Sequence, residues 1–138
     1  NNRLTSVLIP NSVIEIGYGA FSNNQLTSVT IPEGVTYIGY ESFFNNRLTS
    51  VLIPNSVIEI GYDAFSNNQL TSVTIPNSVK EIWSEAFSKS ATSNPNLTNI
   101  INQTGRAFDW GSIINGVSNY YFETGTVVNS YGNVEITK

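Results

Sequence analysis

The sequence predicts an α+β repeat solenoid that ends in a small β-rich C-terminal cap. The phrase Leu-Thr-Ser-Val begins at four positions that are each 22 residues apart, namely Leu4, Leu26, Leu48 and Leu70. Residues 1–32 also match residues 45–76, with Gly19 against Asp63 as the only difference. A fixed period of roughly 20 to 50 residues indicates structural units that stack on one another.

Each unit is expected to contain one short strand and one short helical or 3₁₀ turn. The segment Ser6–Ile9 has the two-residue periodicity of a strand. Pro10 ends that strand, because proline has no N–H group for a ladder. From Val13 to Phe21 the apolar residues follow at spacings of three, four and one, which favours a helical turn with one buried face. The Asn-Asn pair at Asn23 then supplies turn chemistry.

Stacking of the units sets the predicted domain limits. One unit alone has too few apolar side chains to offset the entropy of ordering its backbone, so neighbours must share a core. Four regular units and a degenerate fifth, which begins at Leu97, make residues 1–102 the predicted solenoid. Beyond that range the period fails. Alternating segments at Thr126–Asn129 and Val134–Thr137 follow turn signals, which predicts the β-rich cap over residues 103–138.

Composition excludes several classes of function. The 138 residues contain no histidine, cysteine or methionine, and six Lys and Arg against ten Asp and Glu give a net charge of −4. Without an imidazole or a thiolate, we expect no cofactor, no metal and no enzymatic activity. The thinly spread basic residues argue against nucleic-acid binding. No apolar stretch reaches the roughly 20 residues of a membrane span, so membrane insertion is not expected.

The outward-pointing side chains of the predicted strands form one candidate binding surface, the strand face. Rungs about 4.8 Å apart would place them in two parallel rows on the concave side. In one interpretation this face binds a protein, with Leu8 and Leu52 as apolar contacts. In the other, these side chains are only spacers, since single exposed leucines are common. The strand face consists of Ser6, Leu8, Ser28, Thr30, Ser50, Leu52, Ser72, Thr74, Asn99 and Ile101.

An aromatic column is a secondary candidate. Tyr18, Tyr40 and Tyr62 hold the same place in three successive units, and Trp83 stands beside that place in the fourth. Tyrosines in register can form a stacked strip that grips a protein or a sugar. The alternative, which we favour, is that the rings cover the edge of the core with their hydroxyls in water. Phe44 replaces the serine of the other units and is a further aromatic candidate.

The N-terminal end shows no cap in the sequence. Leu4, Val7 and Ile9 would therefore lie on an exposed end face. Apolar surfaces of this kind favour association. Self-association through this end is accordingly expected.

One motif describes the unit, L-T-S-V-x-I-P-x-x-V-x-x-I-G-x-x-A-F-x-x-N, and it occurs at Leu4–Asn24 and Leu48–Asn68. It resembles the BspA-like (treponemal-type) leucine-rich repeats of bacterial surface proteins. Asparagine, as at Asn24, stands where that family often has cysteine, and the period is one residue shorter than the commoner form. Trp83 also replaces a glycine of the motif. The resemblance implies a leucine-rich-repeat fold in a bacterial protein that is secreted or displayed at the cell surface.

These observations predict a non-catalytic interaction or adhesion module that binds a protein ligand through the strand face. The competing interpretation is a spacer or stalk in a larger surface protein. The near-identity of the two-unit copies favours the spacer, because such copies have not diversified for a partner. Recognition of a glycan or another regular solid is weaker, since Leu8 and Leu52 interrupt the Ser/Thr rows.

Overall fold

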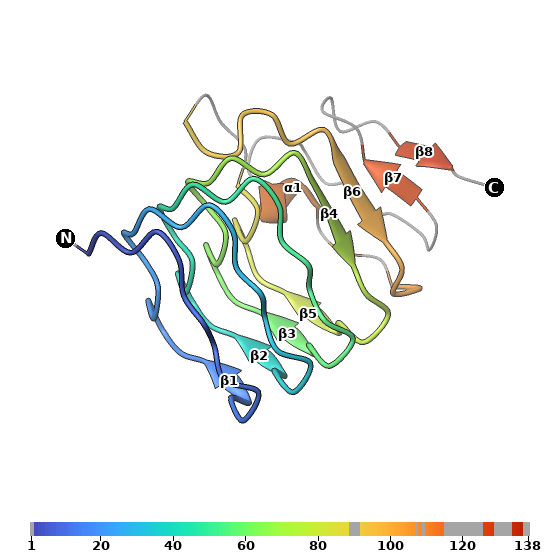
Figure 1. The fold of residues 1–138 in the computed structure, drawn as a ribbon. Coiled ribbons are helices and arrows are strands. Elements are labelled where there is room, and N and C mark those ends of the chain that lie inside the picture. The colour runs from blue at the N-terminus through green and yellow to red at the C-terminus, as the bar shows by residue number, and fades with distance from the viewer. Residues whose placement is uncertain are drawn as a thin grey trace.

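The chain winds in successive coils that lie side by side (Figure 1). This computed structural model describes residues 2–88, 92–106, 108, 110–114, 126–128 and 134–136. Neighbouring coils pair through a parallel sheet of two-residue strands in the order β1-β2-β3-β5. Its register is one unit per strand, because Ile16 pairs with Ile38 and Ile38 with Ile60. The four strands are β1 (Glu15–Ile16), β2 (Tyr37–Ile38), β3 (Glu59–Ile60) and β5 (Glu81–Ile82).

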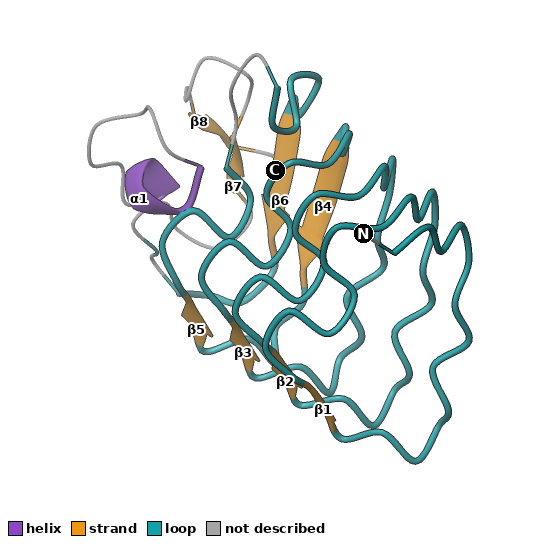
Figure 2. Cartoon of the chain, turned by 90° about the vertical axis from the view of Figure 1, so that its left-hand side faces the viewer, coloured by secondary structure: helices purple, strands orange, loops and turns teal. Residues whose placement is uncertain are grey.

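A second sheet lies across the core from the first (Figure 2). Its parallel pair is β4 (Ser72–Ile75) and β6 (Asn99–Asn102). Two antiparallel strands extend it, β7 (Thr126–Val128) and β8 (Val134–Ile136). Both lie inside the segments that the sequence predicts to be extended. The predicted cap residues 115–125 and 129–133 lie outside the described residues.

The strand predicted at Ser6–Ile9 reaches its full length only in later units, at β4 and β6. At this place in the first three units the structure has a single bridge, between Thr30 and Leu52. The coils are held together nearby by a backbone hydrogen bond of 2.8 Å from the Gln25 N–H to the Leu4 carbonyl, and the same bond recurs in the next two units. Between these coils the first sheet supplies the regular strand pairing, and backbone hydrogen bonds in the turns add to it, such as that from the Phe21 N–H to the Ser42 carbonyl.

The helical turn predicted from Val13 to Phe21 is wrong. The segment forms β1 and then two separate turns, closed by the bonds from Ala20 N–H to Gly17 O and from Ser22 N–H to Gly19 O. Gly19 has a φ of 58°. A right-handed helix needs negative φ throughout, so it cannot pass this point. The corresponding residues of later units share the left-handed backbone, with φ of 51° at Glu41, 53° at Asp63 and 58° at Glu85.

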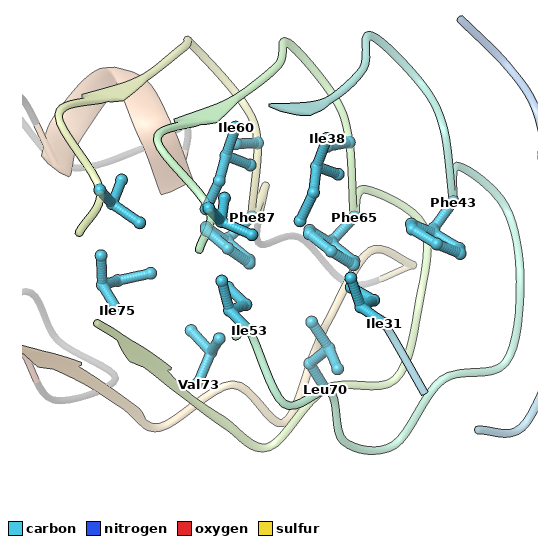
Figure 3. Packing of buried hydrophobic residues seen from close by; sticks show 14 of the residues in the cluster. Ile31, Ile38, Phe43, Ile53, Ile60, Phe65, Leu70, Val73, Ile75 and Phe87 are labelled. Atoms are coloured by element: carbon cyan, nitrogen blue, oxygen red, sulfur yellow. The ribbon is translucent and has the colours of Figure 1, made fainter. Parts of the chain in front are cut away.

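The hydrophobic core fills the space between the two sheets (Figure 3). Ile60 of β3 and Ile53 from the opposite side point toward each other. Phe43, Phe65 and Phe87 stack along the coils with ring centroids 5.3 Å apart. These five side chains are at most 4% exposed. The apolar columns of the repeat are therefore the core, as the periodicity predicts.

A short helix lies within the segment for which the sequence predicts a β-rich cap. It is α1 (Trp110–Ile114), the one helix in the part of the chain that the structure describes. It takes the place that the next coil's turn would occupy, because the Glu85 N–H donates to the Ser112 carbonyl at 2.8 Å and the Phe87 N–H to the Ile113 carbonyl at 3.1 Å. Ile113 is buried and joins the core cluster. The core thus continues past Asn102, where the sequence period stops.

A column of buried asparagines joins the coils. The Asn46 Oδ1 accepts the Leu26 N–H at 3.0 Å. Its Nδ2 donates to the Phe21 carbonyl at 2.8 Å and to the Phe43 carbonyl at 3.2 Å, so one side chain binds two coils. The sequence interpretation treated these pairs as turn chemistry, which holds only for the first member, such as Asn23 with a φ of 58°. The other asparagines that accept a leucine N–H are Asn24, Asn68 and Asn94.

Candidate binding surfaces

The strand face lies at the surface as its predicted orientation requires. Leu8 is 90% exposed and Leu52 is 75% exposed, whereas the next residues inward, Ile9 and Ile53, are buried. Of the ten predicted side chains, nine are exposed and Thr74 is half-buried. The alternation of β4 explains this pattern, because successive side chains of a strand point to opposite faces.

A groove of about 420 Å³ runs between two coils of the strand face. Four of the predicted residues line it, Ser50 and Leu52 from one coil and Ser72 and Thr74 from the next. Three polar residues outside the predicted set, Glu33, Asn55 and Gln103, also line the groove. Leu8 does not, although it holds the same place in its unit as Leu52. The structure thus places Leu52 in this groove and Leu8 in a separate pocket of about 240 Å³ near the N-terminal end.

The aromatic column forms a continuous stack. The ring centroids of Tyr18 and Tyr40 are 5.1 Å apart with planes at 8°, and those of Tyr40 and Tyr62 are 5.3 Å apart with planes at 17°. Tyr18 is 73% exposed, Tyr40 is 36% exposed and Tyr62 is half-buried. Because the faces of Tyr40 are covered by its two neighbours, its edge and hydroxyl are what it presents to solvent.

An acidic row that the sequence interpretation missed accompanies the tyrosines. Glu41, Asp63 and Glu85 each follow one place after the column, and this fixed position is the signal that could have revealed them. The Tyr62 hydroxyl donates to the Glu85 Oε1 at 3.4 Å. The Ser66 hydroxyl donates to the Asp63 Oδ1. These three carboxylates will be called the acidic row.

The acidic row shifts the titration of its neighbours. A hydrogen bond with Glu41, followed by burial, raises the pKa of the Tyr40 hydroxyl. The negative charges of Asp63 and Glu85 raise the pKa of the Tyr62 hydroxyl. Burial raises the pKa of Asp63 itself, against the opposing hydrogen bond from Ser66. All the described charged groups behind these shifts are acidic side chains, so the local field is negative.

Trp83 stands where the first three units have a glycine. A Cβ at Gly39 would lie 2.6 Å from the Ile16 carbonyl oxygen, and one at Gly61 would lie 2.6 Å from the Tyr40 nitrogen. Those glycines let neighbouring coils approach closely. Trp83 instead is 52% exposed, and its Nε1 donates to the Glu59 Oε1 at 2.7 Å. Phe44, the other aromatic candidate, is half-buried.

The N-terminal end of the core is open in this structure. A pocket of about 240 Å³ is lined there mainly by apolar side chains, including Val7, Ile9 and Phe21. Leu4 is 46% exposed, whereas its counterparts Leu26 and Leu48 are fully buried. Of the three residues predicted for this end face, Leu4 is exposed, Val7 is half-buried and Ile9 is buried, so the predicted apolar face is only partly exposed. Its self-association stays a prediction.

A comparison with known families identifies the repeat. The pattern of the BspA type leucine-rich repeat region matches residues 1–114 in six copies. The chain belongs to the BspA-type leucine-rich repeat family. Membership confirms the resemblance drawn from the motif, and it gives the chain the character of a repeat module suited to protein interaction. The match also runs on beyond the five units that the sequence period predicts.

A solved structure supports the fold of this BspA-type chain. It is similar to the crystal structure of a leucine-rich repeat protein from Eubacterium ventriosum, with a TM-score of 0.68 and 24% sequence identity. The similarity covers 92% of this chain and 30% of that protein, so the chain spans about a third of its length. No curated protein matches the chain. The family is thus established by the sequence match, and the structural similarity supports the leucine-rich-repeat fold.

Two further findings concern metal binding and membrane insertion. Among the described residues, no cluster of three or more acidic side chains is placed to hold a metal ion. Over the same residues, no helix has the length and apolar character needed to cross a membrane. The carboxylates of the acidic row are spread over successive coils instead of converging on one point. The candidate sites of this BspA-type chain are therefore extended surfaces that run along successive coils.

Proposed function

We propose that the chain is a non-catalytic interaction module of a bacterial surface or secreted protein, and that it binds a protein ligand through the groove of the strand face. The observation that carries this proposal is Leu52, which is 75% exposed and lines a groove of about 420 Å³. In a protein interface, an exposed apolar side chain supplies contact area that a partner buries, and the polar groups around it supply hydrogen bonds.

The chemistry of the groove suits a polypeptide. Ser50, Ser72 and Thr74 supply hydroxyls that can donate and accept hydrogen bonds, and Leu52 supplies apolar contact. Glu33 adds one negative charge to the lining. Apolar anchors surrounded by hydrogen-bonding groups give both affinity and register in protein interfaces.

The test uses two leucines that occupy the same place in nearly identical units. Leu52→Glu puts a charge into the groove, and Leu8→Glu puts the same charge on the same face outside it. Surface proteins of host cells would be captured on the immobilised chain, identified by mass spectrometry, purified, and titrated calorimetrically against all three proteins. Both leucines are exposed, so circular dichroism should show parent-like folding for each variant.

We expect Leu52→Glu to weaken binding at least tenfold and Leu8→Glu to change it less than threefold. Equal losses in the two variants would move the site from the groove to the whole strand face. A purified ligand that binds both variants as tightly as the parent would refute the strand face altogether.

A structural spacer is the second candidate. The near-identity of residues 1–32 and 45–76 favours it, because the same side chains are repeated along the surface without change. A spacer requires no ligand. Failure to capture any specific protein, together with normal stability of the chain, would support this function over the first.

A further inference from the structure

We propose that the tyrosine column and the acidic row form a second interaction surface, which binds an arginine- or lysine-rich segment of a partner polypeptide. The residues of this surface come directly after the strands of the β1-β2-β3-β5 sheet along the chain. That sheet lies across the core from β4, which carries Ser72 and Thr74 of the groove (Figures 1 and 2). The proposed surface is thus independent of the groove.

The first argument is charge. Glu41, Asp63 and Glu85 repeat along successive coils. Neighbouring carboxylates are the largest cause of the raised pKa of Tyr40 and of Tyr62, whereas the pKa of Asp63 is raised first by burial and then by Glu85 and Glu41. No described cation appears among the groups that act on them. Like charges placed a coil apart repel one another. A cationic partner would relieve that repulsion and gain charge-assisted hydrogen bonds.

The second argument is the orientation of the rings. The Tyr40 ring is stacked between Tyr18 and Tyr62 at about 5 Å on either side, so its faces are occupied. A sugar needs an open aromatic face for stacking, which the interior of the column lacks. The column instead presents hydroxyl oxygens beside the carboxylates. This is a row of hydrogen-bond acceptors, and it complements the donor-only side chains of arginine and lysine.

The third argument is spacing. The rings recur every 5.1 to 5.3 Å, one coil at a time. In an extended peptide, alternate side chains on one face lie about 6.7 Å apart. Long flexible basic side chains span that difference easily. A single metal ion does not fit, because no described cluster of acidic side chains converges as a ligand set.

The test uses a defined probe, a fluorescein-labelled octapeptide that alternates arginine and serine. Fluorescence anisotropy would measure its affinity at low and moderate salt, and amide NMR shifts would locate it on the chain. A glutamate–serine octapeptide serves as the probe of opposite charge. We expect saturable binding of the arginine peptide only, weakening with salt, with the largest shifts at Tyr40, Glu41, Tyr62, Asp63 and Glu85.

Two triple variants separate a local surface from overall charge. Glu41→Gln, Asp63→Asn and Glu85→Gln together neutralise the acidic row. Glu15→Gln, Glu33→Gln and Glu81→Gln together remove the same charge elsewhere. We expect at least a tenfold loss for the first triple and less than threefold for the second. Equal losses, or peptide shifts scattered over the chain, would overturn the proposal.

Single changes guard against a triple variant that fails to fold. Asp63→Asn keeps the side-chain shape, and asparagine tolerates the φ of 53° at this position. Tyr40→Phe removes a hydroxyl and keeps the ring stack. We expect each to weaken the peptide two- to fivefold, and unchanged affinity in both would overturn the proposal. Leu52→Glu should retain full peptide affinity. The proposal for this surface and the proposal for the strand-face groove are therefore tested independently.

Discussion

Residues 1–32 and 45–76 have the same sequence except at one position, yet they lie in different surroundings. Leu4 is 46% exposed and its counterpart Leu48 is fully buried. Phe21 is half-buried and stacks on one ring, whereas Phe65 is fully buried between two. The second copy has a coil on both sides in this structure and the first has a coil on one. Burial in this fold is thus a property of neighbouring coils.

The same comparison separates the two exposed leucines. Leu8 and Leu52 hold equal places in their units, but only Leu52 lies next to the residues that line the groove. Identical side chains therefore serve as matched controls for one another. Substituting the same residue in both copies tests whether its contribution to stability depends on the neighbouring coils or on its own unit.

The largest difference is expected for the stacked phenylalanines. Phe65→Ala removes a fully buried ring from between Phe43 and Phe87 and leaves a cavity, which should cost about 3–5 kcal/mol of unfolding free energy. Phe21→Ala should cost about 1–2 kcal/mol, because its ring is already part-exposed. Urea unfolding of the two variants measures both values. Equal costs would show that the first coil is as well packed as the third.

The asparagine column should show the next largest difference. Asn68→Ala would leave the buried Leu48 N–H without its partner and would remove one of the two side-chain amides that donate to the Phe43 carbonyl, which should cost about 2–4 kcal/mol. Asn24→Ala should cost about 1 kcal/mol, since exposed Leu4 lets water reach the vacated N–H. Hydrogen exchange should accelerate at the Leu48 amide far more than elsewhere. A stable Asn68→Ala variant would mean that the asparagines only form turns.

Alanine substitutions at two glycines should change the free energy of unfolding in opposite directions. A Cβ at Gly61 would clash with the backbone of the preceding coil, so Gly61→Ala should destabilise by about 1–3 kcal/mol. A Cβ at Gly17 meets nothing within 4 Å. Gly17→Ala should instead stabilise by about 0.4–1 kcal/mol, because alanine restricts the unfolded chain. Thermal unfolding of the pair decides the matter, and two changes of the same sign would contradict the close approach of the coils.

The sequence predicts the features that recur in every unit. It does not predict the features that depend on backbone conformation or on contacts between coils. The period predicted the stacked units, and the apolar columns are indeed the core. The helical turn failed because a left-handed residue interrupts it, and Glu41 and Glu85 are not residue types that signal a positive φ. Gly19 and Asp63 are the residues at this place whose types do favour a positive φ. Helix α1 fell where no period guided the prediction.

The candidate surfaces were predictable in part for the same reason. Strand alternation correctly placed Leu8 and Leu52 at the surface. The groove could not be found from the sequence, because it needs two coils and Gln103, which follows the insertion before the fifth unit. The tyrosine stack was one of two stated alternatives. The ring faces are covered because tyrosines of successive coils stack on one another, and this contact cannot be inferred from one unit.

The smallest effect concerns the one position at which the two copies differ. Burial raises the pKa of Asp63, so the folded chain holds a proton there to higher pH than the unfolded chain. Its ionisation therefore costs stability above the folded pKa, and this cost disappears as the pH falls below the unfolded value. Asp63→Asn should raise Tm slightly at pH 7, and the gain should shrink between pH 7 and pH 3. Differential scanning calorimetry against Glu33→Gln, a loss of charge away from the acidic row, measures the trend. A gain that stays constant with pH would assign it to the left-handed backbone, which asparagine tolerates well.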